Sequence, residues 1–145
     1  MPDLATTTFA VPISDSKSWK ASLCLNLEIR EGETRMTKLS HHGPLRVQKP
    51  FQESDGSCHV YLLHPPGGLV GGDRLDISIL AGAGTDTVIT APAAAKFYGC
   101  SDSMPAQTQN VTIETSKDAH IEWLPQESIF FNGAKAELRT DIRLR

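Results

Sequence analysis

Apolar residues recur at every second position along most of this chain. Successive side chains of a β-strand point to opposite faces, so each such stretch predicts a strand with one buried face. The alternating stretches are residues 21–29, 75–81, 111–115 and 134–144. A turn at 31–33 and a return strand at 36–39 follow the first stretch. The apolar run 60–63 does not alternate, which is typical of a strand covered on both faces.

No window of a dozen residues has the 3.6-residue period of a helix, and residues 92–98 have room for at most a short helical turn. The sequence therefore predicts an all-β fold, with stacked or helical-type β-layers and at most one or two short helices.

The segment 58–73, CHVYLLHPPGGLVGGD, joins a strand-like run to a dense cluster of special backbone residues. Proline fixes φ and lacks the N–H donor, whereas glycine permits positive φ and close approach of another backbone. The residues concerned are Pro65, Pro66, Gly67, Gly68, Gly71 and Gly72. They predict a turn that lets two β-layers approach closely. Asp73 closes the segment either as a turn-stabilising carboxylate or as a functional one.

A weak internal repeat supports stacked layers. Each copy has the order strand, polar turn, strand, proline and aromatic pair. The proline and the aromatic pair are Pro92 with Phe97 and Tyr98 in the first copy, and Pro125 with Phe130 and Phe131 in the second. A repeat of this length predicts β-layers in which each copy covers the apolar face of its neighbour.

Composition excludes several classes of protein. The formal net charge is −3 and no Lys/Arg cluster is present, which argues against a nucleic-acid surface. No window approaches the 18 apolar residues of a membrane span. The scattered thiols Cys24, Cys58 and Cys100 form no CxxC pair, as expected of reduced cysteines in a cytoplasmic protein. Residues 1–18 lack the features of a secretory signal and are predicted to be a flexible tail.

Catalytic signals are weak. Residues 64–73, called the glycine segment below, lack the Lys-Ser/Thr of a phosphate-binding loop. The chain also has no GxSxG elbow and no Cys/His nucleophile signature. Glu122 and Glu127 flank a proline corner and suit either proton transfer, a cation path or plain solvation. Cys58 and His59 are adjacent, so a regular strand would point them to opposite faces and prevent joint chelation. We therefore expect no enzymatic activity.

Four segments in order resemble the UreD urease accessory protein family, also called UreH. They are GPLRVQKPF (43–51), CHVYLLHPPGGLVGGD (58–73), ITAPAAAKFY (89–98) and EWLPQESIFFNGAKAEL (122–138). The resemblance covers residues 19–145, and members of this family are about twice as long as this chain. It implies that residues 19–145 are the N-terminal part of a β-rich domain whose C-terminal half is missing. The alternating pattern that continues to Arg145 agrees with this expectation.

The resemblance also implies a function. Proteins of this family are non-enzymatic maturation factors that bind apo-urease and UreF, through which they meet the GTPase UreG, and the hetero-oligomer delivers Ni²⁺ to urease. It implies no tightly bound cofactor and only transient Ni²⁺. Oxygen and imidazole ligands suit such passage, so we expect Asp73, Glu122 and Glu127 to line a nickel route, with Cys58, His59 and His64 as further candidates. The alternatives are an inactive fragment of such a protein and a β module that binds a small ligand at GGLVGGD.

Overall fold

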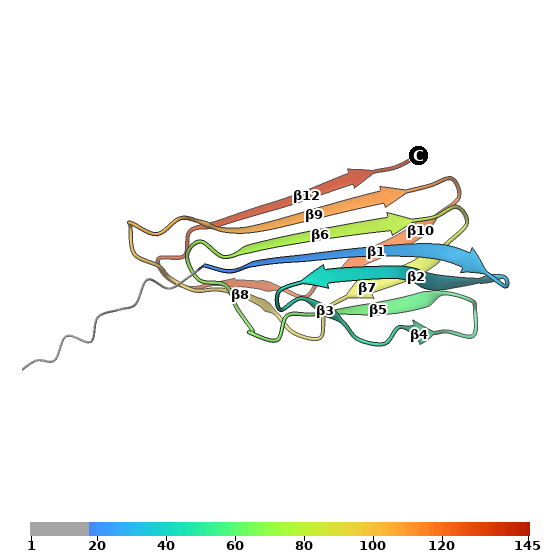
Figure 1. The fold of residues 1–145 in the computed structure, drawn as a ribbon, viewed down its shortest axis with the longest axis horizontal. Coiled ribbons are helices and arrows are strands. Elements are labelled where there is room, and N and C mark those ends of the chain that lie inside the picture. Colours follow the sequence, from blue (N-terminus) through green and yellow to red (C-terminus); the bar gives the residue numbers. More distant parts are fainter. Residues whose placement is uncertain (1–17) are drawn as a thin grey trace, which may run out of the picture.

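The structure is a computed structural model that describes residues 18–145 (Figure 1). The predicted tail, residues 1–18, lies outside the described residues apart from Ser18. Twelve strands and no helix occur in the described part: β1 (Lys20–Arg30), β2 (Glu33–His42), β3 (Arg46–Val47), β4 (Phe51–Gln52), β5 (Cys58–Leu63), β6 (Arg74–Ala81), β7 (Asp86–Thr90), β8 (Ala95–Phe97), β9 (Gln107–Thr115), β10 (His120–Leu124), β11 (Ser128–Phe130) and β12 (Ala136–Arg143). The all-β prediction is confirmed. Within these residues, then, no helix is long and apolar enough to cross a membrane.

Five long strands form the first sheet, in the order β12-β9-β6-β1-β2 (Figure 1). Strands β1, β6, β9 and β12 run parallel, and β2 returns antiparallel to β1. The predicted turn between β1 and β2 is confirmed, with positive φ at Glu31 (53°) and Gly32 (82°). The first sheet thus joins strands that are far apart in sequence.

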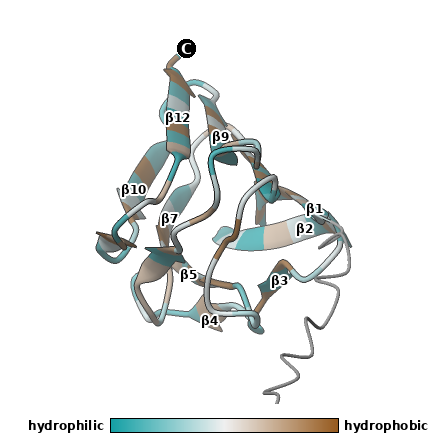
Figure 2. Cartoon of the chain, turned by 90° about the vertical axis from the view of Figure 1, so that its left-hand side faces the viewer, coloured by the Kyte–Doolittle hydropathy of each residue, from teal (hydrophilic) through white to brown (hydrophobic). Residues whose placement is uncertain are grey.

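The second sheet has the order β10-β7-β5-β3, with β4 also paired to β5, and a small third sheet pairs β8 with β11. Strands β5, β7 and β10 run parallel, whereas β3 and β4 are antiparallel to β5. Figure 2, viewed from one end, places β9 and β12 on one side of the molecule and β5 and β7 on the other. The two larger sheets therefore form separate layers.

The chain winds through the sheets as stacked coils. β6, β7 and β8 form one coil, and β9, β10 and β11 pair with them in parallel as the next. β12 then returns to the first sheet beside β9. Phe97 stacks on Phe130 with ring centroids 4.9 Å apart, and Tyr98 stacks on Phe131 at 5.0 Å. The stacking predicted from the repeat is confirmed. Residues 95–97 form β8 in place of the helical turn that the sequence allowed.

The hydrophobic core lies between the two larger sheets. Leu25, Ile79 and Ile113 occupy equivalent positions on β1, β6 and β9 and are fully buried. Val60 on β5 faces them from the second sheet and is also fully buried. In the run 60–63 only alternate side chains are buried, so the prediction of a strand covered on both faces was wrong. The outer side of β5 is covered only in part, where Phe51 packs edge-on against Tyr61 at 5.6 Å.

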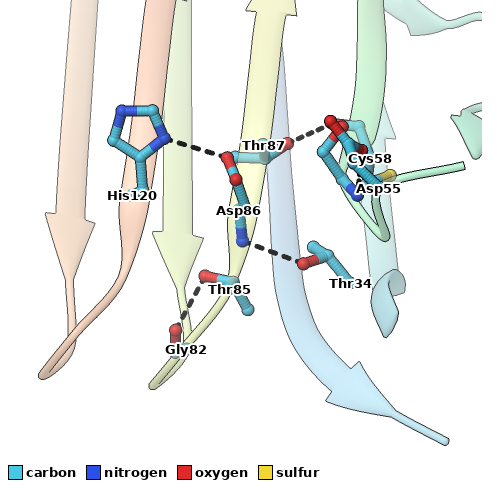
Figure 3. A network of polar contacts seen from close by, with 9 residues as sticks. Thr34, Asp55, Cys58, Gly82, Thr85, Asp86, Thr87 and His120 are labelled. Carbon is cyan, nitrogen blue, oxygen red and sulfur yellow. Dashed lines mark hydrogen bonds and ion pairs between the residues drawn. The ribbon is translucent and has the colours of Figure 1, made fainter. Parts of the chain in front are cut away.

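Buried threonines tie the ends of the strands together (Figure 3). The Thr34 hydroxyl on β2 accepts a hydrogen bond from the Asp86 backbone N–H at 2.9 Å. The Thr87 hydroxyl donates to the Cys58 carbonyl at 2.6 Å, and Thr85 donates to the Gly82 carbonyl at 2.7 Å. Because each threonine is buried, these bonds satisfy polar groups that water cannot reach.

The glycine segment after β5 adds one layer to the small sheet formed by β8 and β11. Leu69 pairs in parallel with Phe97, its N–H donating to the Lys96 carbonyl at 2.8 Å. A Cβ built on Gly71 would lie 2.7 Å from Met104 Cβ and 3.0 Å from Cys100 Cβ. Gly71 thus packs closely against the loop between β8 and β9, and the prediction that these glycines let two β-layers approach stays a prediction.

Gly71→Ala should destabilise the chain by about 2 kcal/mol, because the added methyl group must displace packed neighbours. Urea unfolding followed by circular dichroism measures the loss. Ser54→Ala, at an exposed position, is the control and should change the free energy of unfolding by less than about 0.5 kcal/mol. Equal stability of the two variants would contradict the close packing at Gly71.

Candidate functional site

Asp73 is buried at the end of the glycine segment, with 1% of its surface exposed. Its Oδ1 accepts a hydrogen bond from the Trp19 N–H at 3.1 Å, and its Oδ2 accepts one from the Val70 N–H at 2.9 Å. The carboxylate thus joins the segment before β1 to the turn before β6. Of the two roles left open by the sequence, this geometry supports the turn-stabilising one.

His64 lies close to Asp73 at the start of the same segment. Its ring centroid is 5.1 Å from that of Trp19, and its Nε2 is buried without a hydrogen-bond partner. Burial lowers the pKa of His64 below the ordinary value of 6.5, while the negative charge of Asp73 acts in the opposite direction. The imidazole is therefore held neutral near pH 7, with a free ring nitrogen in an apolar setting.

A cavity of about 690 Å³ lies beside His64, between the two larger sheets. Its walls are mostly apolar and include Leu62, Ile77, Trp123 and Leu138. Pro65 and Gly67 bring the glycine segment to its rim. Asp73 is absent from this lining, since its oxygens are directed to the backbone of Trp19 and Val70.

Cys58 and His59 point to opposite faces of β5, as the sequence predicted. Cys58 is buried in the core, and burial raises the pKa of its thiol above the ordinary value of 9.0. A protonated thiol is a poor metal ligand, because the thiolate is the coordinating form. His59 is half-buried on the outer face, with its Nδ1 4.0 Å from a carboxylate oxygen of Glu53.

The outer face of the second sheet brings together residues that the sequence keeps apart. His59, Val88 and Glu122 are paired in register across β5, β7 and β10, and the Glu122 side chain is exposed. Asp86 and His120 are paired at the start of β7 and β10, with Asp86 Oδ1 2.9 Å from His120 Nδ1 (Figure 3). We call His59, Asp86, His120 and Glu122 the outer rungs.

The carboxylates of the outer rungs raise the pKa of His120. Its pKa is raised above 6.5, first by the hydrogen bond and charge of Asp86 and then by the charge of Glu122. The sequence alone did not single out Asp86. It lies at the start of β7, at the position equivalent to that of His120 at the start of β10. Glu127 lies apart, exposed before β11, with its carbonyl accepting the Ala95 N–H at 3.0 Å.

These positions do not form a resident metal centre. Among residues 18–145 there is no group of three or more His, Cys, Asp or Glu side chains placed to hold a metal ion. Asp73 and His64 lie together on the glycine segment, His59 and Glu122 lie on the second sheet, and Cys58 points into the core. The residues predicted to line one route therefore fall into separate places.

The fold and these surfaces define an all-β protein built of stacked parallel coils, with charged residues on the outside of one sheet. The UreD urease accessory protein family matches residues 20–145, and the chain belongs to this family.

Three relatives illustrate the similarity, and each carries the description urease accessory protein UreD. The relative from Klebsiella aerogenes is 46% identical over 128 residues, covering 88% of this chain and 47% of that protein. The relative from Vibrio parahaemolyticus is 45% identical over 132 residues, covering 91% and 46%. The one from Aliivibrio fischeri strain MJ11 is 44% identical over 131 residues, covering 90% and 45%. The chain spans about half the length of these relatives.

Asp73→Ala should destabilise the chain by about 3 kcal/mol, because two backbone N–H groups lose their acceptors. Asp73→Asn retains one carbonyl oxygen and should cost about half as much. Urea unfolding of the two variants measures this order. A wild-type stability for Asp73→Ala would show that the carboxylate does not hold the segment.

His64 should make stability depend on pH. Because its folded pKa is lowered, the unfolded chain binds the proton more readily, so stability falls as the pH drops below 6.5. We expect the loss between about pH 7.5 and about pH 5.5 to be smaller in His64→Gln than in the wild type. Urea unfolding at both pH values gives the comparison. An equal loss in both proteins would contradict the burial of a neutral ring.

Proposed function

We propose that this chain acts in urease maturation, as a non-enzymatic scaffold in a cytoplasmic hetero-oligomer. In this proposal it binds apo-urease and UreF, meets the GTPase UreG through UreF, and helps to deliver Ni²⁺ as cargo. The observation that carries the proposal is the family match over residues 20–145, which includes all four segments noted in the sequence. The curated relatives are described as urease accessory proteins.

The outer rungs support brief contact with a divalent cation. They offer imidazole and carboxylate groups, which bind nickel without the tight hold of thiolates. His59 on β5 and Glu122 on β10 are aligned in register through Val88 of β7, and Asp86 and His120 lie at the start of β7 and β10. Sites with fewer than three protein ligands release an ion readily, which suits cargo in transit.

We assign different parts to the other predicted route residues. Asp73 would act by holding the glycine segment, since both of its oxygens already accept backbone hydrogen bonds. His64 would offer a neutral nitrogen at the cavity wall, and Glu127 an exposed carboxylate near β11. Cys58 would remain a core residue, because its thiol is buried and protonated.

The alternative of a ligand loop at GGLVGGD has weaker support. A cradle for a small anion needs open space around its glycines. A Cβ on Gly68 would meet Tyr98 Cε2 at 2.3 Å, and one on Gly71 would meet Met104 and Cys100. The space around these two glycines is already filled by side chains of the same chain.

The test is complementation of a strain that has urease and all accessory proteins except its UreD. The tagged chain is expressed there alone and fused to the part of the Klebsiella aerogenes relative that lies outside the match. Urease activity, urease-bound nickel and co-purification of urease and UreF are measured. We expect at least the fusion to restore activity and to retain both partners. Absence of both partners and of activity in a folded fusion would overturn the proposal.

A pair of variants of the active form tests the outer rungs. Glu122→Gln removes a rung carboxylate and should lower urease-bound nickel by about twofold to tenfold, as expected when a metal contact is weakened. Glu28→Gln, on β1 of the first sheet, is the matched control and should leave nickel content unchanged. Equal nickel contents in the two variants would exclude a role of Glu122 in delivery.

A further inference from the structure

Strand β2 forms one edge of the first sheet, and among residues 18–145 only β1 pairs with it. Every residue from Thr37 to His42 is exposed. The edge that faces away from β1 therefore presents backbone N–H and C=O groups that no described strand satisfies. An unpaired edge of this kind can accept an extended segment of another protein as an added strand.

The two halves of β2 differ in how far this edge is closed. In the first half, the Thr34 N–H donates to the Gly56 carbonyl at 3.1 Å. The register with β1 then shifts and leaves Thr37 without a partner, as in a β-bulge, which turns an edge away from further pairing. Residues 38–42 continue in regular register with residues 22–26. We call residues 38–42 the open half of β2.

Positive charge gathers beside the open half. Residues 34–52, which span most of β2 and all of β3 and β4, contain four of the 14 lysines and arginines of the chain and none of its 17 aspartates and glutamates. The whole chain has a formal net charge of −3, so this stretch is opposite in sign to the rest. Its basic residues are spread out in the sequence, and it is the fold that brings Lys38 and Arg46 to the same edge.

The basic groups lie on both faces of the open half. His41 pairs with the buried Leu23 and so lies on the inner face of the first sheet, where Arg46 of β3 places its Nη1 3.0 Å from His41 Nδ1. Lys38 and His42 have the opposite parity along the strand and lie on the outer face. Figure 2 places β2 and β3 on the same side of the molecule. An added strand would therefore have basic groups on both of its faces.

These positive charges are not neutralised within the described chain. Arg35, in the first half of β2, has a partner in Glu33. Arg46 donates to two backbone carbonyls. Within residues 18–145, neither Lys38 nor Arg46 has a carboxylate partner. Both can therefore attract an acidic ligand.

Leu39 adds an apolar contact to the open half. It pairs with Leu25 of β1, which is 0% exposed, yet Leu39 itself is 37% exposed. Leu39 thus extends the inner apolar row of the first sheet to its edge. A matching strand would carry apolar side chains on its inner face, against Leu39, and acidic side chains on its outer face, against Lys38.

We propose that the open half of β2 is a docking edge for an extended segment of a partner protein in which acidic side chains alternate with apolar ones. Backbone hydrogen bonds to the edge supply affinity, while Lys38 and Arg46 select for negative charge. A second copy of this chain fits less well, because pairing two β2 edges would bring basic side chains together. β2 plays no part in the proposed function, so the two proposals can fail separately.

The test uses the 145-residue chain and, in parallel, the fusion with the Klebsiella aerogenes segment. The probes are two short acetylated and amidated peptides, in which valine alternates with glutamate or with lysine. Valine favours the extended conformation in both, so the peptides differ in the sign of their charge. NMR titration measures binding, and we expect the glutamate peptide to bind at least about tenfold more tightly. Equal binding of the two peptides would overturn the proposal.

Hydrogen exchange distinguishes strand pairing from attraction by charge alone. An added strand would pair the outward N–H groups of residues 38–42. We expect their exchange to slow by at least about tenfold when the glutamate peptide is bound. Binding that leaves this exchange unchanged would overturn the proposal.

A matched pair of variants locates the contact. Lys38→Glu and Lys117→Glu change the net charge equally, and Lys117 is an exposed residue of the turn between β9 and β10. We expect only Lys38→Glu to weaken the glutamate peptide, by at least about fivefold, and to bind the lysine peptide more tightly than the wild type does. A gain of binding cannot come from misfolding. Equal effects of the two variants would overturn the proposal.

Other occupants give different results. If a second copy of this chain covers β2, sedimentation will detect a wild-type dimer that the glutamate peptide does not dissociate. If the edge takes nucleic acid, a single-stranded oligonucleotide will displace the glutamate peptide at equal concentration. Either result would overturn the proposal and leave the proposed function intact.

Discussion

Parallel, in-register pairing between successive coils is the constraint on which this structure depends. Each strand of the β6–β8 coil pairs with its counterpart in the β9–β11 coil, so equivalent residues lie directly over one another. Apolar side chains must then recur at equal positions, as they do at Ile79 and Ile113 and at Phe97 and Phe130. The core is therefore a set of ladders, each completed only by the neighbouring coil.

The glycine segment begins one of these ladders without being a regular strand. Leu69 pairs with Phe97, and Asp73 fixes the exit into β6 through two backbone hydrogen bonds. Gly71 permits the close contact with Cys100 and Met104 that this path requires. The segment that looked most like a binding loop thus carries the chain from the second sheet through the small sheet to the first, and its carboxylate serves that passage.

Local patterns in the sequence predicted much of the fold but little of the site. Alternation predicted β1, β6, β9 and β12, and the repeat predicted the stacking of Phe97 on Phe130. Alternation does not specify which strands are partners, so the two-sheet arrangement could not be derived from it. The placement of His59 in line with Glu122 requires the register of β5, β7 and β10. One of the two hydrogen bonds of Asp73 comes from Trp19, 54 residues away in sequence, and no local signal encodes that bond.

The stacked aromatic pairs have an evolutionary consequence. Because Phe130 and Phe131 repeat the positions of Phe97 and Tyr98, a duplicated coil can be added without redesigning the contacts already present. Insertion of one residue within a strand would instead move its whole apolar set to the opposite face. Lineages of such proteins can therefore lengthen by whole coils or within the turns between strands, while the strands themselves must keep their spacing.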